Sequence, residues 1–228
     1  MIINDYHDRE IDAVNEPLRP IPSGLVTLQE ALIFAVLLSV LGFAFAFLSS
    51  LLCLTVALVA WALLLTYTTV GKRSGLPGNF LVSACVAIPF IYGSVTVTNQ
   101  FELNVLLFAS MVFLSNTGRE ITKGIVDIKG DAAKGVKTLA VRYGDRRATI
   151  AAVVFYLSAV LLSPIPLLWR LVSIWFIPLV LVTDLGLVFS SFLLLRNSSR
   201  EKAKKIKNMV LIWFIIGLLA FLLGAVLK

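Results

Sequence analysis

Two clusters of acidic residues stand out in a chain that otherwise carries few charges. The first lies in residues 4–24, which read NDYHDREIDAVNEPLRPIPSG. Asn4, Asp8 and Asp12 recur there every four residues, and Asp5 precedes Asp8 by three. On a helix this spacing places the side chains in one stripe, where neighbouring carboxylates repel each other. The stripe therefore favours a bound cation.

The second cluster lies in residues 118–144, which read GREITKGIVDIKGDAAKGVKTLAVRYG. Asp127 and Asp131 repeat the four-residue spacing, and Gly130 between them lowers helix propensity, which indicates a close approach or a local break. Mg²⁺ prefers hard oxygen ligands that leave room for waters and phosphate oxygens. With the nearby basic residues, the two clusters predict a site for Mg²⁺ and a diphosphate. These basic residues are Arg19, Lys72, Arg119, Lys123 and Arg142.

A simpler reading of such acidic pairs is a solvated loop surface. One pair alone would support only that reading, but two pairs in a chain with 14% charged residues favour a metal site. The sequence patterns of an EF-hand, a P-loop and a HExxH zinc helix are absent from the chain. These absences leave Mg²⁺-assisted chemistry on a phosphate-bearing substrate as the favoured hypothesis.

The composition requires a membrane around these clusters. Of the 228 residues, 59% are hydrophobic, and the mean hydropathy is +0.94, which excludes most soluble classes. A helix that crosses the bilayer needs about 20 apolar residues. We therefore predict an all-α, polytopic transmembrane bundle with seven full spans. The apolar runs lie at 25–48, 51–70, 80–98, 103–118, 148–169, 173–195 and 208–227.

The charges test this count independently. If seven spans alternate across the membrane, residues 1–24, 71–79, 119–147 and 196–207 share one side, and they carry every Lys and Arg except Arg170 and Lys228. The positive-inside rule then places these segments in the cytoplasm. We predict a multi-pass protein of the cell membrane with both acidic motifs on the cytoplasmic side. Topology accounts for the net charge of +7, which therefore gives no reason to expect a nucleic-acid partner.

The segment before the first span is rich in proline. Pro17, Pro20 and Pro22 end any preceding helix and predict an extended linker. Met1 runs directly into the acidic cluster without a signal peptide.

Three segments carry a resemblance to a known family. NDYHDREIDAVNEPLRPIPSG and DIKGDAAKGVKTLAVRYG resemble the two aspartate-rich motifs of the UbiA family of intramembrane prenyltransferases, and KRSGLPGNFLVSACVAIPFIYGS resembles the segment between them. The similarity extends over essentially the whole chain. It implies one transmembrane prenyltransferase domain over residues 1–228, built as a helical bundle of typically nine spans around a lipid-open cavity. REITKGIVDIKGD looks closest to archaeal members of ether-lipid biosynthesis.

The resemblance also implies roles for individual residues. It implies that Mg²⁺ is bound by Asn4, Asp8, Asp12, Asp127 and Asp131, of which the four aspartates are catalytic. Arg19 and Lys72 resemble the cations that hold the diphosphate. We also predict that Arg119 and Lys123, the basic residues near the second motif, bind the diphosphate. Asp5 is the companion acid of the first motif.

Two departures from the family pattern stand out. Gly124 replaces an acid that many relatives carry, which could change how the second metal is held. Seven spans and a short stub stand where the family has nine spans, so we expect the chain to be truncated at its N-terminus.

The implied reaction transfers a geranylgeranyl group from geranylgeranyl diphosphate to the sn-2 hydroxyl of geranylgeranylglyceryl phosphate. The expected partners are thus an isoprenoid diphosphate, a lipid-phosphate acceptor and membrane lipids, and the oligomeric state stays open. An aromatic quinone precursor or a chlorophyllide is an alternative acceptor, because the first motif also resembles chlorophyll synthases. A transporter or a non-catalytic remnant is the alternative of another class, although residues 25–118 and 148–227 show no convincing repeat.

Four further residues have ordinary explanations. Cys53 and Cys85 lie inside apolar runs without a pairing motif, so we expect them to pack as small hydrophobic residues. Asp184 within the sixth span is either a functional residue or a partner for hydroxyl groups of a neighbouring helix. His7 lies off the acidic stripe and is interpreted as a neutral bystander.

Overall fold

The structure is a computed structural model that describes residues 2–133 and 135–227. Within the first helix, the side chains of Asp8, Ile11, Val14 and Asn15 lie outside this description. The secondary structure of the described residues is helical, without strands. In chain order the elements are α1 (Ile2–Asn15), α2 (Leu28–Ser49), α3 (Leu51–Thr69), η1 (Gly71–Arg73), α4 (Leu76–Thr98), α5 (Leu103–Val126), α6 (Ile128–Ala133), α7 (Leu139–Leu162), α8 (Ile165–Leu168), α9 (Phe176–Arg196) and α10 (Arg200–Val226).

Six helices in the described part of the chain are long and apolar enough to cross a membrane. They are α2, α3, α4, α7 continued through α8, α9 and α10. The sequence predicted a seventh span at 103–118, which forms the first part of α5. The second half of α5 is polar, with Asn116, Arg119 and Glu120 among its residues, so α5 falls outside this group. The multi-pass helical fold is confirmed, with one apolar span fewer than predicted.

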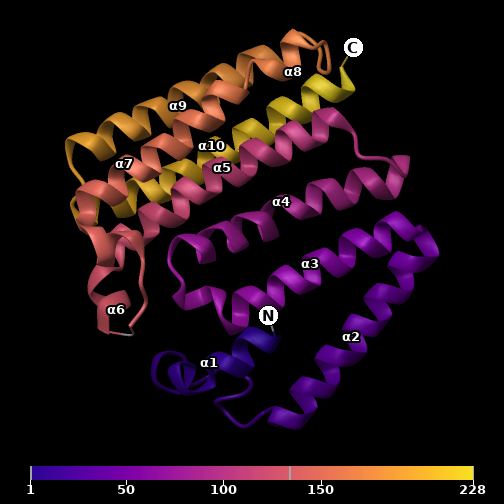
Figure 1. Cartoon of the computed structure of the whole chain (residues 1–228), viewed down its shortest axis with the longest axis vertical. Helices are drawn as coiled ribbons and strands as arrows, with labels where there is room; N and C mark the ends of the chain where they lie inside the picture. The colour runs from indigo at the N-terminus through magenta and orange to yellow at the C-terminus, as the bar shows by residue number, and fades with distance from the viewer. Residues whose placement is uncertain (1, 134, 228) are drawn as a thin grey trace.

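The helices lie side by side in one bundle (Figure 1). The helices α5, α7, α9 and α10 form the densest part, where α5 contacts both α7 and α10. Its core contains Tyr156, Leu194, Ile206 and Val210. Because α5 is packed among α4, α7 and α10, its polar half lies inside the bundle and not against lipid.

The helices α2 and α3 form the more exposed edge of the bundle (Figure 1). Most of their large apolar side chains are exposed, as expected where lipid is the solvent. A small core holds α3 to α2 and α4 through Ala46, Cys53, Val56 and Val95. Cys53 is buried there, Cys85 is partly buried, and both are free thiols. The prediction that Cys53 packs as a small hydrophobic residue is therefore confirmed.

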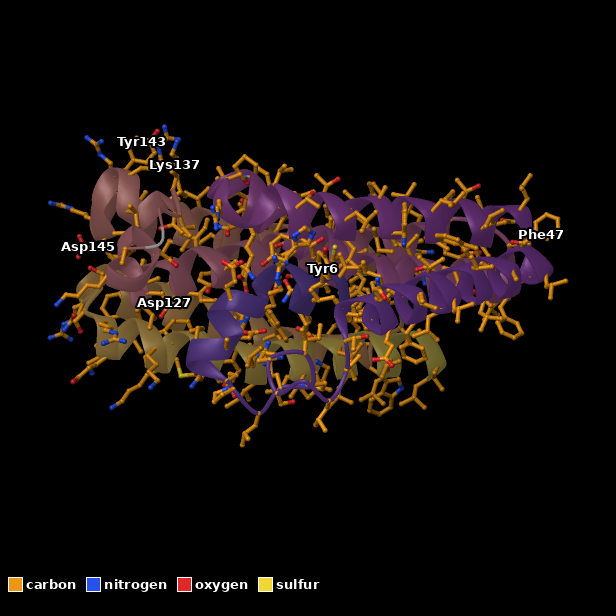
Figure 2. The ribbon with its side chains drawn as sticks, turned by 90° about the horizontal axis from the view of Figure 1, so that it is seen from below. Tyr6, Phe47, Asp127, Lys137, Tyr143 and Asp145 are labelled. Carbon is orange, nitrogen blue, oxygen red and sulfur yellow. The ribbon has the colours of Figure 1, made fainter. Side chains whose placement is uncertain are left out.

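The polar connections gather toward one end of the bundle. Figure 1 shows η1, α6 and the α9–α10 connection at one end, with α1 in the same half, whereas the α2–α3 connection and α8 lie at the other. Figure 2 shows Asp127, Lys137, Tyr143 and Asp145 at one end and Phe47 at the other. The segments that the charge pattern groups together thus lie toward the same half of the bundle.

The linker between α1 and α2 differs from its prediction. As expected from Pro17, α1 ends at Asn15. The residues after it are not extended but fold into successive turns, in which the Arg19 amide donates to the Glu16 carbonyl and the Ser23 amide to the Arg19 carbonyl. Proline fixes φ at a value that suits turns as well as extended chain. The turns bring Arg19 back toward α1.

Candidate active site

A cavity of about 250 Å³ lies at the polar end of the bundle. It collects four of the predicted site residues, namely Asp127 and Asp131 of the second motif and the cations Lys72 and Lys123. The rest of its wall comes from Tyr67, Arg73, Gly75, Gly78, Asn79, Val82, Glu120, Gly124, Val136 and Thr138. Carboxylates and ammonium groups thus border one space between α3, α4, α5 and α6. We call this space the front cavity.

The helix break at Asp127 places both carboxylates on this wall. Asp127 caps the C-terminus of α5 with φ −105° and ψ 13°. The Asp131 amide then donates to the Asp127 carbonyl at 2.8 Å, so the helical spacing continues into α6. The break predicted at Gly130 is not found there, because Gly130 lies inside α6; the helix is interrupted three residues earlier, at Asp127. The alternative of a close approach is wrong, because a Cβ on Gly130 would meet no atom within 4 Å.

A tight loop contact brings Lys72 to the second motif. The Lys137 amide donates to the Arg73 carbonyl at 3.3 Å, which joins the α3–α4 turn to the segment after α6. Gly75 makes this approach possible, since its φ is +78° and a Cβ there would collide with the Lys137 carbonyl oxygen. Sequence reasoning had no signal for this contact, because the two segments are more than 60 residues apart.

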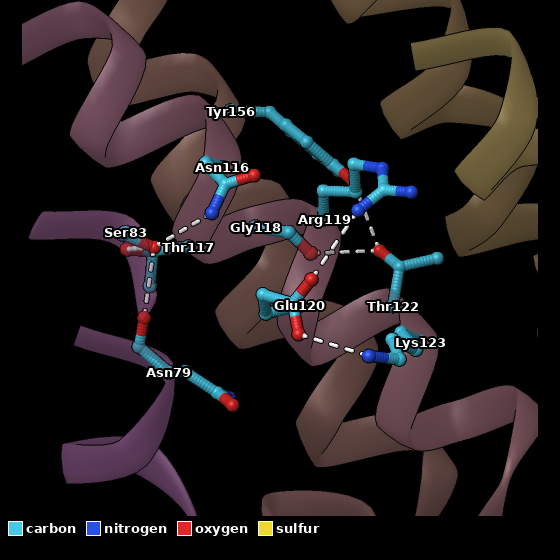
Figure 3. Close-up of polar contacts among 10 residues, drawn as sticks. All are labelled: Asn79, Ser83, Asn116, Thr117, Gly118, Arg119, Glu120, Thr122, Lys123 and Tyr156. Atoms are coloured by element: carbon cyan, nitrogen blue, oxygen red, sulfur yellow. Dashed lines mark hydrogen bonds and ion pairs between the residues drawn. The ribbon is translucent and has the colours of Figure 1, made fainter. Parts of the chain in front are cut away.

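Glu120 organises the cations beside the second motif. Its carboxylate lies 3.2 Å from Arg119 Nη1 and 3.5 Å from Lys123 Nζ, and its side chain is 12% exposed (Figure 3). Arg119, a predicted diphosphate ligand, is not among the described residues that line the front cavity. Its guanidinium contacts Glu120 instead. Glu120 precedes Asp127 by seven residues, and sequence reasoning assigned it no role.

A buried hydrogen-bond network holds α4 against α5 next to the cavity. Ser83 Oγ accepts from Asn116 Nδ2 and from Thr117 Oγ1, and it donates to the Asn79 carbonyl (Figure 3). On the α7 side, Thr122 and Tyr156 form a buried hydroxyl pair at 3.0 Å. Because buried polar groups need partners, these bonds fix the rotation of α5. Sequence reasoning missed the network, although polar residues within an apolar run gave a signal.

Two acidic residues of the first motif, Asp5 and Asp12, contact Arg19 of the same chain. Arg19 Nη1 donates to Asp12 Oδ2 at 2.8 Å and lies 3.5 Å from Asp5 Oδ1. The Asp12 carboxylate raises the pKa of the Arg19 guanidinium through this hydrogen bond and through its charge. Asp12 is only 6% exposed. Arg19 thus offers one positive charge to an acidic stripe that contains Asp5, Asp8 and Asp12.

The two motifs do not share one described cavity. Asn4, Asp5 and Asp12 are absent from the described lining of the front cavity. Asp5 and Arg19 instead border a separate cavity between α1, the linker and α2. Asp8 was predicted as a catalytic and metal-binding residue, and its side chain lies outside the described residues.

The described side chains include no group of three or more His, Cys, Asp or Glu residues arranged to hold a metal ion. Mg²⁺, however, is commonly bound by one or two carboxylates together with waters and substrate phosphates. Asp127 and Asp131 offer such a pair on the front cavity, with Glu120 on the same wall. The donor set therefore fits Mg²⁺ when a phosphate substrate completes it.

Two other candidates have local explanations. Asp184 accepts a hydrogen bond from the Ser163 hydroxyl, which supports the interpretation that it pairs with a hydroxyl group of another helix. His7 is exposed, and its ring lies edge-on to Tyr6 with the centroids 5.6 Å apart.

Comparison with known proteins identifies the family. The sequence model of the UbiA prenyltransferase family matches residues 1–216. The chain belongs to the UbiA prenyltransferase family. The predicted resemblance is confirmed, and the protein is a prenyltransferase with a multi-pass membrane fold.

Relatives within this family are similar over nearly the whole chain. Digeranylgeranylglyceryl phosphate synthase of Korarchaeum cryptofilum is 38% identical and covers 97% of this chain and 79% of its own length. The synthase of Archaeoglobus fulgidus is 37% identical, with coverage of 98% and 78%.

Solved structures agree with this prenyltransferase fold. A structure from work on digeranylgeranylglyceryl phosphate synthase in membranes has a TM-score of 0.90 at 32% identity and covers 99% of this chain and 80% of that one. The apo structure of a UbiA homologue from Aeropyrum pernix K1 has a TM-score of 0.78 at 22% identity, with coverage of 98% and 83%, and supports the fold.

Proposed function

We propose that this prenyltransferase transfers a geranylgeranyl group from geranylgeranyl diphosphate to the sn-2 hydroxyl of geranylgeranylglyceryl phosphate. The observation that carries the proposal is the 38% identity to a digeranylgeranylglyceryl phosphate synthase over 97% of the chain. The front cavity supports it, because carboxylates and cations border one space at the polar end of an apolar bundle. A phosphorylated head group and an isoprenoid tail match these two environments.

The diphosphate end of the donor fits the cations of the front cavity. Lys72 and Lys123 supply positive charge for the phosphate oxygens, and Glu120 holds Lys123 in place. Asp127 and Asp131 would hold Mg²⁺, which when bound supplies further stabilisation of the charge that develops on the leaving diphosphate. Asn4, Asp8 and Asp12 are proposed as the ligands of the first motif, with Asp12 already bonded to Arg19.

The transfer needs ionisation of one bond and protection of the product cation. The bond between C1 and the diphosphate oxygen breaks, the acceptor hydroxyl oxygen bonds to C1, and its proton passes to the leaving diphosphate or to the Glu120 carboxylate. Tyr67 on the cavity wall offers an aromatic face to an allylic cation. The apolar helices exclude water that would otherwise capture this cation.

We further propose that the polar end of the bundle faces the cytoplasm. Every Lys and Arg except Arg170 and Lys228 lies in the segments gathered toward that end, as the positive-inside rule requires of a cytoplasmic face. The front cavity and both acidic motifs would then open toward the cytoplasm.

The test uses the purified chain in lipid nanodiscs with Mg²⁺, labelled geranylgeranyl diphosphate and geranylgeranylglyceryl phosphate. The expected product is the diether phosphate, identified by mass spectrometry. Prenylation of an aromatic acid or a chlorophyllide, without any diether, would assign the chain to another branch of the family. No transfer to any of these acceptors would contradict the proposed activity.

A further inference from the structure

Arg200, the first residue of α10, reaches the end of a different helix. Its Nε donates a hydrogen bond of 3.1 Å to the backbone carbonyl of Val126. Val126 is the last residue of α5, and Asp127 comes directly after it. One guanidinium therefore connects the α9–α10 turn to the backbone immediately before the first carboxylate of the second motif.

The accepting carbonyl lies where α5 needs a partner. The last four carbonyl groups of a helix have no partner within that helix, and the negative end of the helix dipole attracts cations. At Asp127 the backbone leaves helical geometry, and the Asp131 amide bonds to the Asp127 carbonyl only after this break. The orientation of Asp127 thus depends on how the end of α5 is held. Arg200 holds it from outside the helix.

Arg200 acts from the side opposite to the substrate cations. Asp127 and Asp131 also line a second cavity, of about 650 Å³, whose wall includes Val126, Asp145 and Arg200. The second motif therefore forms a partition, with Lys72 and Lys123 on the front cavity. In the described part of the chain, Arg200 does not line the front cavity, so it is poorly placed to bind the diphosphate there.

A second contact fastens the same turn. Ser198 Oγ donates to Asp145 Oδ2 at 3.0 Å, which joins the α9–α10 turn to α7. The α9–α10 turn is therefore bonded to α5 and to α7, the helices that precede and follow α6 in the chain. Membrane topology accounts for the basic segment 196–207 as a whole, whereas the contact with the end of α5 belongs to Arg200.

We propose that Arg200 is a positioning residue for the second acidic motif. Through the Val126 carbonyl it fixes the end of α5, so that Asp127 presents its carboxylate to a divalent cation in the front cavity. This inference rests on the proposed function for the role of Asp127, while the contact that carries it is independent of any substrate.

The test compares Arg200→Gln with Lys202→Gln in the full chain in nanodiscs. Lys202 is the matched control, because it is an exposed cation two residues further along α10. Hydrogen–deuterium exchange of peptides covering residues 121–133 reports the end of α5. We expect exchange to be roughly threefold to tenfold faster in Arg200→Gln, as loss of one hydrogen bond predicts, and unchanged in Lys202→Gln.

Binding of Mn²⁺, measured by electron paramagnetic resonance in the presence of inorganic diphosphate, reports the carboxylates. We expect roughly tenfold weaker binding in Arg200→Gln, as for other residues that orient metal ligands, and an intermediate value in Arg200→Lys. Equal exchange in the two Gln variants would overturn the proposal. Faster exchange with wild-type Mn²⁺ affinity would also contradict the proposal, because Arg200 would then cap α5 without orienting Asp127. Neither readout needs prenyl transfer, so an inactive wild type would count against the proposed function alone.

Discussion

At the scale of single residues, the two acidic motifs differ in what balances their charge. Asp12 is 6% exposed and receives a hydrogen bond from Arg19. Asp127 and Asp131 instead border a cavity that Lys72 and Lys123 also line. A metal at the first motif would have to share Asp12 with Arg19 or displace it, whereas the second motif already faces space for a ligand.

This difference predicts a strong dependence of activity on Asp131. In Asp131→Asn the carboxylate that faces the front cavity loses its charge, so we expect prenyl transfer to fall roughly 100-fold or more, as for other groups that stabilise transition-state charge. Glu102→Gln is the control, because Glu102 precedes α5 at the opposite end of that helix. Transfer rates measured in nanodiscs test this prediction. Wild-type activity in Asp131→Asn would show that the front cavity is not the active site.

The pairing of Arg19 with Asp12 makes a separate prediction about α1. Arg19→Gln leaves a buried carboxylate without its cation, so we expect a protease of broad specificity, such as subtilisin, to cleave the 16–27 linker several-fold faster. Adding Asp12→Asn should restore much of the resistance, since the unpaired charge is then removed. Arg9→Gln should change little, because its partner Glu10 is 86% exposed. Equal cleavage of all three variants would contradict a stabilising role for the pair.

At the scale of elements, hydropathy and helical spacing predicted most of what the structure contains. Six spans coincide with continuous apolar runs, and the spacing of Asp127 and Asp131 placed both on one wall. The full length of α5 was not predictable from hydropathy, because its polar residues are satisfied by partners on α4 and α7. The return of Arg19 to Asp12 was missed for a similar reason, since it depends on turns within the linker.

The close packing of α5 on α7 can be tested with two glycines of the same helix. A Cβ on Gly118 would lie 2.8 Å from Tyr156 Cε1 and 2.9 Å from the Ala152 carbonyl oxygen, whereas one on Gly124 would lie 3.5 Å from the nearest atom, Thr138 Cβ. We expect Gly118→Ala to lower the free energy of unfolding by about 1–3 kcal/mol. Gly124→Ala should change it by less than about 1 kcal/mol, because alanine favours the helix.

Thermal unfolding in detergent, monitored by circular dichroism, compares the two variants. A loss of stability in Gly124→Ala equal to that in Gly118→Ala would show that the approach of α5 to α7 does not limit the fold.

At the scale of the whole molecule, the bundle separates an apolar body from one charged end. The connections that carry most Lys and Arg lie toward the end that holds α6 and η1 (Figures 1 and 2). The front cavity opens among these segments. Charge distribution and site location therefore make one joint prediction, which is that the site faces the cytoplasm.

Single cysteines at the two ends test this orientation. In a Cys53→Ala, Cys85→Ala background, Gln100→Cys marks the α4–α5 connection and Lys202→Cys marks the start of α10, and both positions are exposed. We expect a membrane-impermeant maleimide to label Gln100→Cys in intact cells and Lys202→Cys only after permeabilisation. The opposite pattern would place the acidic motifs outside the cell, where they could not meet a cytoplasmic diphosphate. Labelling of both in intact cells would contradict a fixed orientation, since the two positions lie at opposite ends of the bundle.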